Sequence, residues 1–352
     1  MLIISKQLDM IMRPFTHPMT SIVEKKYRLN NRTTTEFTKK GVSHPQKFSG
    51  VILIGKLGSG GKILSLNQYG MRNYKASIPL STNTKFRIAS NTKLFTALAI
   101  MILQQEKKLH VNDRVNLYTP HLLPKSLYSS QVTIHQLLTN TSGLTANPSY
   151  KSIHSLGFSA KPGTRYIYSN SNYMILGKII EKVAGYSFES YIKMRILQPL
   201  QLHETGFSNT MQGISRKTEE YVQFSNILVP IDESRFHLQA AGGMYSTVTD
   251  LFKFNLNWTK LVSPDTIYMM FQKNKTSLNS SKRYYYGYGR VIANNQTYWR
   301  HIGEMGGCYC VNSVFLKRRI SLIYFSNIRP MLAKQFPLTL FYHIKKHLID
   351  YL

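Results

Sequence analysis

The sequence predicts an α+β fold, an α/β sandwich in which an antiparallel sheet built from both ends of the chain is flanked by helices. Segments rich in β-branched residues occur early, at Val51–Gly55 and Ile63–Leu66, and further strand patterns return after residue 283. Short helical patterns separated by turns occupy most of the chain between them. One sheet assembled from distant parts of the chain, carrying an inserted and mostly helical region, accounts for this order.

Length and composition set the domain organisation that we expect. The chain has 352 residues, of which 43% are hydrophobic and 12% aromatic, so a core is available and disorder along the whole chain is excluded. Residues 1–46 are polar, basic and aperiodic, and predict a poorly ordered extension. Residues 47–352 predict one domain, whose sheet part spans 47–110 and 236–352 and whose helical insertion spans 111–235.

The individual elements follow in order along the chain. The first two strands flank a turn with Gly58, Gly60 and Gly61, which is typical of a hairpin. A helix is expected at Phe86–Leu109, and its apolar run Leu94–Leu103 indicates that it is buried. The other expected elements are helices at Thr133–Leu138, Tyr173–Ala184, Ser187–Leu197 and Phe336–Leu352, and strands at Tyr284–Ile292, Gln296–Arg300, Cys308–Leu316 and Ile320–Ser326.

What the sequence lacks excludes several classes of protein. Its two cysteines, Cys308 and Cys310, are too few for a disulfide scaffold, a cysteine-based zinc site or an iron–sulfur cluster. We predict no metal ion and no cofactor. No stretch reaches the roughly 18 apolar residues of a membrane span, so no transmembrane segment is predicted. Met1–Phe15 shows no clear signal-peptide core, which leaves the localisation open.

Positive charge is in large excess, with 45 Lys and Arg against 16 Asp and Glu and a formal net charge of +29. A field of this sign attracts polyanions such as nucleic acid, anionic lipid or an anionic cell-wall polymer. A general basic bias of the organism's proteins explains the charge equally well. Because charge alone does not choose a partner, we predict no specific nucleic-acid binding.

Ser90-Asn91-Thr92-Lys93 is the most informative short motif. The chain contains two other Ser-x-x-Lys matches, at Ser59 and Ser190, but the first lies in a glycine turn and the second inside an amphipathic helix. Lys93 is expected on the first turn of a buried helix, where burial lowers the pKa of an amine and where Ser90 shares its face. A serine activated in this way is a nucleophile without a histidine triad. The alternative is that Ser90 caps the helix and Lys93 extends into solvent.

Two further elements favour the chemical interpretation. Tyr168-Ser169-Asn170 follows a Pro-Gly turn and precedes a helix, so polar side chains are presented there, and a tyrosine beside a lysine is able to shuttle protons. His301-Ile302-Gly303 comes at a strand edge, followed by Glu304, and its glycine permits a close backbone approach to a ligand. A backbone N–H in this segment would complete an oxyanion hole with the N–H of Ser90.

In this order and spacing the three elements resemble the penicillin-binding and β-lactamase-like serine hydrolases, in particular the branch of class C β-lactamases and serine D-Ala-D-Ala carboxypeptidases. The similarity runs from about Phe48 to Asn327 and implies a β-lactamase/transpeptidase-like fold, with 47–352 as the serine hydrolase domain. Other segments that carry it are Phe86-Arg87-Ile88-Ala89-Ser90, Leu137-Leu138-Thr139-Asn140-Thr141-Ser142-Gly143-Leu144, Ala240-Ala241-Gly242-Gly243-Met244 and Ser246-Thr247 with Asp250.

The resemblance implies a role for each site residue. Ser90 is the acylated nucleophile with Lys93 as its partner, and Tyr168 is the general base for acylation and the acid for the leaving group. Asn170 holds the substrate or Lys93. His301, Gly303 and Glu304 belong to the substrate-binding strand, with the N–H groups of Ser90 and Glu304 as the oxyanion hole.

The third motif departs from the pattern of the family at two positions. His301 stands where a lysine is usual, and Ile302 stands where a threonine hydroxyl usually meets the substrate carboxylate. Loss of a charge-assisted hydrogen bond there would cost about 1.5–3 kcal/mol of recognition, so efficient β-lactam hydrolysis is not expected. Glu304 would also repel an anionic substrate if its side chain pointed inward.

The function implied is hydrolysis of an ester or amide through an acyl-enzyme at Ser90, with a D-alanyl group of the bacterial cell envelope as the plausible substrate. A carboxypeptidase and a D-amino-acid esterase both fit this description. One alternative is a promiscuous carboxylesterase of the same fold, which Ile302 favours. The other is a non-catalytic protein that binds an anionic cell-wall polymer through its basic surface. Family and charge together suggest the cell envelope or the exterior of the cell.

Overall fold

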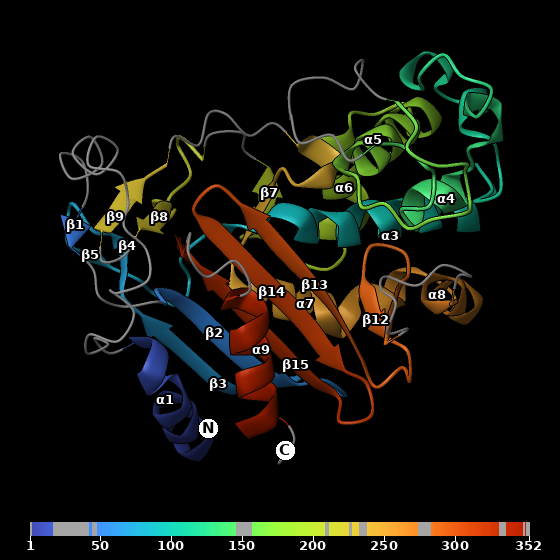
Figure 1. Cartoon of the computed structure of the whole chain (residues 1–352). Helices are drawn as coiled ribbons and strands as arrows, with labels where there is room; N and C mark the ends of the chain where they lie inside the picture. Colours follow the sequence, from blue (N-terminus) through green and yellow to red (C-terminus); the bar gives the residue numbers. More distant parts are fainter. Residues whose placement is uncertain are drawn as a thin grey trace.

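A seven-stranded antiparallel sheet forms the centre of the structure, with helices on both faces (Figure 1). The computed structural model describes residues 2–16, 42–43, 48–145, 157–207, 211–224, 227–231, 238–273, 283–330, 336–347 and 349. The strand order is β11 (Tyr284–Tyr286), β12 (Val291–Ala293), β13 (Tyr298–Met305), β14 (Cys308–Phe315), β15 (Ile320–Ser326), β2 (Gly50–Lys56) and β3 (Lys62–Tyr69). This architecture confirms the predicted α+β fold class.

The join between β15 and β2 unites the two ends of the chain. Their register runs from Ile320 opposite Lys56 to Ser326 opposite Gly50, so segments more than 260 residues apart are hydrogen-bonded neighbours. All other pairs in this sheet connect strands that follow one another along the chain, and short turns suffice for them. The prediction that one sheet is assembled from distant segments is confirmed.

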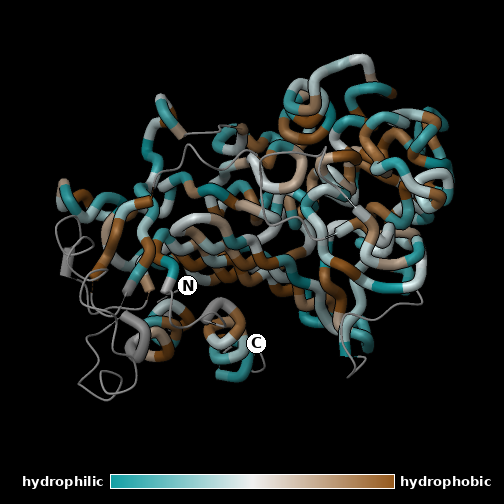
Figure 2. The backbone as a smooth tube through the Cα atoms, turned by 45° about the horizontal axis from the view of Figure 1, so that its top comes forward, coloured by the Kyte–Doolittle hydropathy of each residue, from teal (hydrophilic) through white to brown (hydrophobic). Residues whose placement is uncertain are grey.

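Alternate residues of the central strands pack against two different helical layers. On β2, Val51 and Leu53 belong to the larger apolar cluster, whereas Ile52 and Ile54 belong to the smaller one on the opposite face. Helices α3 (Thr92–Gln105), α7 (Val248–Asn257) and α8 (Pro264–Phe271) cover the first face. Helices α1 (Leu2–Thr16) and α9 (Phe336–His347) cover the second, where Figure 2 shows both termini on one side of the strongly hydrophobic strands.

The segment between the two parts of the sheet carries α4 (Ile134–Leu138), α5 (Asn170–Ala184) and α6 (Phe188–Ile192), which continues as a π-helical turn (Lys193–Leu197). Short 3-10 segments are η1 (Ala89–Asn91), η2 (Val115–Leu117), η3 (Pro120–Leu122), η4 (Ser129–Gln131), η8 (Gln239–Ala241) and η9 (Trp258–Leu261). Minor sheets contain β1 (Val42–Ser43), β9 (Ile227–Pro230), β8 (Tyr221–Phe224) and β16 (Ile328–Pro330); β6 (Phe86–Arg87), β10 (Met244–Ser246) and β7 (Gly206–Phe207); and β4 (Met71–Asn73) and β5 (Ile78–Pro79).

Three predicted elements differ in detail from the observed ones. The strand expected at Tyr284–Ile292 is a hairpin of two short strands, because Gly287 and Gly289 allow a turn between them. The strand expected to end at Arg300 continues through the following glycine to Met305. The expected helix from Phe86 begins only at Thr92, since its first residues pair with β10 and then form η1.

In the predicted N-terminal extension, residues 2–16 form a folded helix and residues 42–43 a short strand, which corrects the prediction of poor order for these residues. Leu8 and Met12 of α1 have no exposed surface and pack in the smaller cluster. Asp9 accepts hydrogen bonds from Asn67 Nδ2 at 3.0 Å and Tyr69 Oη at 2.7 Å on β3. An apolar residue every fourth position gives α1 a buried face that its intervening charges disguise in the sequence. Residues 17–41 lie outside the described residues.

Two features concern the cysteines and the membrane spans that were considered in the sequence. Cys308 and Cys310 are free thiols on the same face of β14, both in the larger cluster. A search of the described residues finds no helix that combines the length and the hydropathy of a membrane span.

We expect Leu8→Ala to lower the free energy of unfolding by about 2–4 kcal/mol, because it leaves a cavity between α1 and β3. Met10→Ala on the same helix is the matched control, since Met10 is 66% exposed, and should change the free energy of unfolding by less than about 0.5 kcal/mol. Urea denaturation of both variants measures this. Equal, negligible effects would mean that α1 does not pack on the sheet.

Candidate active site

The backbone of β13 meets the backbone of η1 in very close contact. β12 pairs with β13 only as far as Arg300, so the edge from His301 to Met305 is free of that neighbour. A Cβ added to Gly303 would lie 2.3 Å from the carbonyl oxygen of Ile88 and 3.0 Å from the amide nitrogen of Ser90. Only glycine permits this approach, which places the strand edge beside the backbone of Ser90.

Ser90 and Lys93 lie together at the start of the buried helix α3. The Nζ atom of Lys93 is 3.0 Å from Ser90 Oγ, 2.8 Å from Asn170 Oδ1 and 2.7 Å from the carbonyl oxygen of Ala241. Lys93 has no exposed surface, whereas Ser90 is partly exposed. The lysine therefore does not extend into solvent, and the alternative predicted from the sequence is wrong for Lys93.

Burial lowers the pKa of Lys93 well below its usual value. The hydrogen-bond partners of Lys93 Nζ are compatible with a neutral amine and with an ammonium ion. Asn170 Oδ1 and the Ala241 carbonyl accept hydrogen bonds only, so they occupy two N–H groups of Nζ in either form. Ser90 Oγ is the third neighbour and is able to accept from the ammonium or to donate to the lone pair of the amine.

Tyr168 reaches the same serine from the segment before α5. Its Oη lies 2.8 Å from Ser90 Oγ, and its ring centroid is 5.0 Å from Lys93 Nζ. The side chain is 37% exposed, so the phenol is bounded by the buried pair on one side and by solvent on the other. Ser90, Lys93, Tyr168 and Asn170, predicted separately from the sequence, form one hydrogen-bonded group.

Asn140 positions this segment and was not singled out as a site residue from the sequence. Its carbonyl oxygen accepts from the Ile167 N–H, and its Oδ1 accepts from the Ser169 N–H and from Asn172 Nδ2. Asn140 itself has a left-handed backbone conformation, with φ of 56°, which asparagine tolerates better than most residues. The sequence did place Asn140 in the segment Leu137–Leu144, which resembles the family, but no role was predicted for that segment.

His301 lies in the interior beside the group, with 2% of its surface exposed. Burial, together with the nearby Lys93, lowers the pKa of His301 to about 3, so the imidazole is neutral at pH 7. Its ring packs 6.1 Å from that of Tyr286, which also lies 6.3 Å from the ring of Tyr168. The position where the family pattern has a lysine therefore carries no positive charge here.

Ile302 and Glu304 face away from the buried group. Ile302 packs in part against the cluster on the opposite face of the sheet. The carboxylate of Glu304 is paired with Arg329 Nε of β16 at 2.5 Å. The side chain of Glu304 does not point inward, so the condition under which it would repel an anionic substrate is not met.

No group of three or more His, Cys, Asp and Glu side chains is arranged to hold a metal ion in the described part of the chain. The polar atoms gathered around Ser90 are an amine, a phenol, an amide and backbone groups. This arrangement suits proton transfer to and from one hydroxyl group.

Comparison with known proteins agrees with the geometry. The family model named Beta-lactamase matches residues 57–339, about four fifths of the chain. The chain belongs to the beta-lactamase family. Members of this family are serine hydrolases, so the resemblance identified from the sequence is confirmed.

Two curated relatives of this beta-lactamase-family chain illustrate its range. "Protein flp" of Staphylococcus aureus (strain MW2) is 33% identical over 243 residues, which cover 63% of this chain and 47% of that protein. The chain thus spans about half the length of flp. "Putative penicillin-binding protein PbpX" of Bacillus subtilis (strain 168) is 30% identical over 295 residues, covering 80% of this chain and 71% of PbpX.

Solved structures share the fold. An octameric penicillin-binding protein homologue from Pyrococcus abyssi has a TM-score of 0.71 at 26% identity and covers 89% of this chain and 76% of its own. A D-amino acid amidase from Ochrobactrum anthropi SV3 has the same TM-score at 20% identity, covering 86% and 95%. At that identity the amidase shows the fold alone.

We expect Gly303→Ala to lower the rate of serine acylation at least about 100-fold and to destabilise the protein by about 1–3 kcal/mol, because the new methyl group pushes β13 away from η1. Gly157→Ala is the control, since its added Cβ would only touch Thr145 at 3.8 Å. Labelling kinetics with an acylating probe and urea denaturation measure the two effects. A Gly303→Ala variant as reactive as the Gly157 control would contradict the close approach.

His301 should make stability depend on pH. Its pKa is about 3 when folded and ordinarily 6.5, so as the pH falls from 6.5 towards 3 the unfolded chain takes up a proton that the folded chain does not. Wild type should therefore lose up to about 4 kcal/mol relative to His301→Gln over this range. Urea denaturation at several pH values measures the difference, with the exposed His121→Gln as control; a difference independent of pH would contradict the burial of a neutral imidazole.

Proposed function

We propose that this chain is an acyl-serine hydrolase in which Ser90 Oγ attacks the carbonyl carbon of an ester or amide. The observation that carries the proposal is the placement of Ser90 Oγ between Lys93 Nζ at 3.0 Å and Tyr168 Oη at 2.8 Å. A hydroxyl with two proton-transfer groups at hydrogen-bond distance fulfils the geometric requirement for an activated nucleophile. A serine that only caps a helix does not need a buried lysine and a tyrosine at its hydroxyl group.

In the acylation step the Oγ–carbonyl bond forms and the bond to the leaving group breaks. The phenolic oxygen of Tyr168 accepts the serine proton and gives its own proton to the leaving alcohol or amine, so the phenol is unchanged at the end. Lys93 Nζ hydrogen-bonds to Ser90 Oγ and holds it in place for the attack. Deacylation repeats the sequence with water in place of the serine, which returns Ser90 as a hydroxyl and releases the acid.

The negative charge on the carbonyl oxygen requires donors on the other side of the reacting carbon. We assign these to the backbone N–H groups of Ser90 and Glu304. The support for this assignment is the contact of β13 with η1 at Gly303, which places the strand edge next to the nitrogen of Ser90. Backbone donors are fixed before the reaction begins, and this preorganisation makes them effective.

The charges around the serine favour a substrate without a carboxylate next to the scissile bond. His301 is neutral, Ile302 has no hydroxyl group and Arg329 is already paired with Glu304. A carboxypeptidase must bind the terminal carboxylate of its peptide, so we place an ester or amide ahead of a D-Ala-D-Ala peptide. A D-alanyl ester of the cell envelope fits, and a promiscuous carboxylesterase is the second candidate that these same residues favour.

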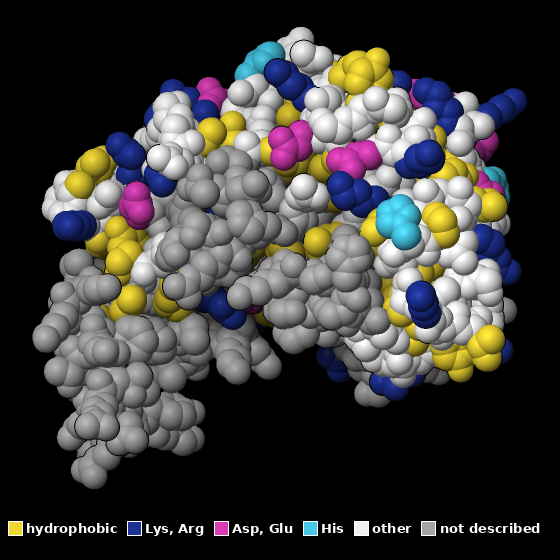
Figure 3. All heavy atoms as spheres, turned by 90° about the horizontal axis from the view of Figure 1, so that it is seen from above, with side chains coloured by type: hydrophobic (Ala, Val, Ile, Leu, Met, Phe, Trp, Pro, Cys, Tyr) yellow, Lys and Arg dark blue, Asp and Glu magenta, His cyan; other side chains and the backbone are white. Residues whose placement is uncertain are grey.

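The distribution of charge supports an envelope location for the reaction. The net charge is +29, and Figure 3 shows Lys and Arg side chains spread over the described part of one face, with fewer Asp and Glu among them. Such a surface is attracted to an anionic wall polymer. We infer that the protein works at the cell envelope, where the same polymer brings acyl groups to it.

We expect Ser90→Ala to abolish labelling by a fluorophosphonate probe and to lower kcat/KM on an acyl ester by at least about 10³-fold. Tyr168→Phe should lower it by about 10²–10⁴-fold, because proton transfer to the leaving group is lost. The controls are Ser190→Ala, from a second Ser-x-x-Lys match, and Tyr166→Phe, two residues from Tyr168. Both should retain wild-type rates.

The choice of substrate separates the candidates. Faster turnover of D-alanyl than of L-alanyl esters supports the D-alanyl assignment, whereas equal turnover of all short acyl esters supports the carboxylesterase. Strong penicillin labelling or release of D-alanine from a D-Ala-D-Ala peptide would overturn the argument against a carboxylate subsite. No labelling of wild type, together with salt-sensitive binding to wall polymer, would identify a non-catalytic polymer-binding protein.

A further inference from the structure

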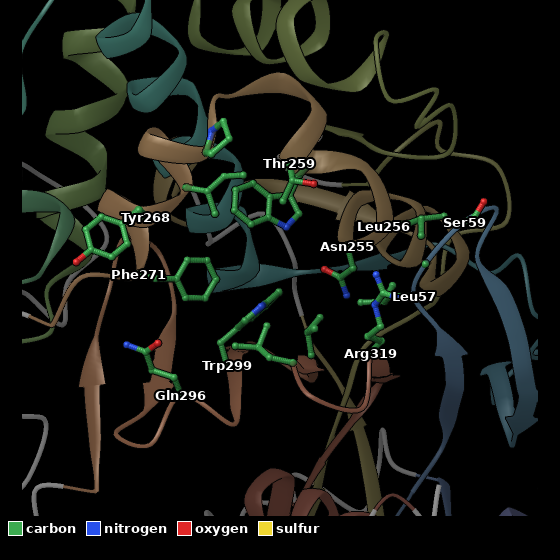
Figure 4. A pocket seen from close by; sticks show the side chains of 16 residues that line it. Leu57, Ser59, Asn255, Leu256, Thr259, Tyr268, Phe271, Gln296, Trp299 and Arg319 are labelled. Atoms are coloured by element: carbon green, nitrogen blue, oxygen red, sulfur yellow. The ribbon is translucent and has the colours of Figure 1, made fainter.

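A pocket lies on the face of the sheet covered by α7 and α8, and Ser90 is not among its lining residues. Its volume is about 730 Å³, within the range of small-molecule sites. Figure 4 shows Phe271 and Trp299 on one side of the space and Asn255, Leu256 and Arg319 on the other. None of the residues predicted for the active site lines this pocket.

Three aromatic residues form one side of the pocket, and we call Trp258, Phe271 and Trp299 the aromatic wall. Trp258 and Phe271 are stacked, with centroids 6.4 Å apart and planes 23° apart. Tyr268, which also lines the pocket, is 70% exposed and extends this apolar surface to the solvent. Rigid aromatic groups of this kind bind apolar ligands at a low cost in side-chain entropy.

A positive charge is buried directly behind the aromatic wall. The guanidinium of Arg290 lies 4.6 to 4.9 Å from the centroids of the three rings, and Arg290 has no exposed surface. Its Nη1 and Nη2 atoms have no hydrogen-bond partner among the described residues. Burial lowers the pKa of Arg290 to about 9, so it remains charged at pH 7. The field of this unneutralised charge disfavours a cation in the pocket and favours an anion.

The rim of the pocket has the same sign. Arg319 is an exposed residue in the turn before β15 and is the one charged residue among those described that line the pocket. The polar residues near it are neutral: Ser59 and Gln296 are exposed, whereas Asn255 is already hydrogen-bonded to Asn312 and Ser321. The pocket therefore has an apolar side and a neutral polar side. One positive charge, Arg319, lies at its exposed rim, and another, Arg290, is buried beside the aromatic wall.

We propose that this pocket binds a small amphiphilic anion, with the apolar body of the ligand against the aromatic wall and its carboxylate facing Arg319. Phe271 and the exposed Tyr268 supply most of the apolar contact area, beside the largely buried Trp258 and Trp299, and Arg319 and Arg290 supply the charge complementarity. The site is separate from Ser90, so a molecule bound there is an additional ligand rather than the acyl group under attack.

Tryptophan fluorescence is a direct probe of this pocket, because Trp258 and Trp299 are the two tryptophans of the whole chain. We would titrate the full chain with 6-phenylhexanoate, 6-phenylhexan-1-ol and 6-phenylhexylamine, which share one apolar body and differ in charge. The carboxylate should change the fluorescence saturably and bind at least about 5-fold more tightly than the amine, with the alcohol between them.

Two variants and their controls place the ligand. Arg319→Gln should weaken binding of 6-phenylhexanoate about 2- to 5-fold, whereas Lys317→Gln, which removes a charge from the same turn outside the pocket lining, should not. Thr259→Phe fills the pocket from an exposed position of η9 and should weaken binding at least about 10-fold. Ser90→Ala should bind as wild type does.

The proposal is overturned by any of three results. The first is the absence of a saturable change with the carboxylate. The second is equal or tighter binding of the amine. The third is equal binding by wild type, Arg319→Gln and Thr259→Phe, which would place the ligand elsewhere. Loss of binding in Ser90→Ala would instead assign the ligand to the active site, and this outcome is independent of whether Ser90 is acylated.

Discussion

A lysine with no access to water organises the site, and the structure on both sides depends on how its amine is satisfied. Lys93 Nζ has three polar neighbours: Ser90 on the same turn, Asn170 at the start of α5 and the carbonyl of Ala241 in η8. These partners are 3, 77 and 148 residues away along the chain. Removing one of them would leave a buried amine or its partner unsatisfied, at a cost of about 1–3 kcal/mol or more. The internal hydrogen bonds of Lys93 therefore join α3, α5 and η8 at one point. They also place a base-like nitrogen beside a serine.

The second constraint is the close contact between η1 and β13, and a buried ion pair connects the segments on its two sides. Arg87, just before η1, pairs with Glu220 at 2.8 Å, and the other oxygen of Glu220 accepts the backbone N–H of Gly307 after β13. Both charged side chains are 2% exposed or less. One carboxylate thus binds the segment that carries Ser90 and the turn that ends β13. Asn91 adds a hydrogen bond from η1 to the carbonyl oxygen of Cys310 on β14. Because the contact is held from several directions, the proposed backbone donors of Ser90 and Glu304 would need no rearrangement when charge develops.

Parts of this arrangement were predictable because they depend on local pattern. Apolar periodicity located α3, α5 and the central strands, and the motif around Ser90 located the reacting group. Tyr168 was also predictable as a site residue, because a turn before a helix often exposes a polar side chain. Other parts were not predictable: the carbonyl of Ala241 carries no side-chain signal, and Asn140 acts through backbone contacts that exist only in the fold. The helix α1 was missed because charged residues interrupt its apolar face, and its burial is decided by β3 and α9.

Charge at the surface and charge at the reacting group have separate consequences. At physiological ionic strength a surface charge is screened within about 8 Å, so the basic exterior acts on encounter with a polyanion rather than on bond breaking. Around Ser90, the described groups are a buried amine, a neutral imidazole and the Glu304–Arg329 pair, which leaves little net charge to select a small substrate. Salt should then weaken attachment to an anionic polymer while leaving the turnover of a small neutral ester nearly unchanged. Under the proposed function, the basic exterior would determine where the protein attaches, and the buried groups around Ser90 would determine its chemistry.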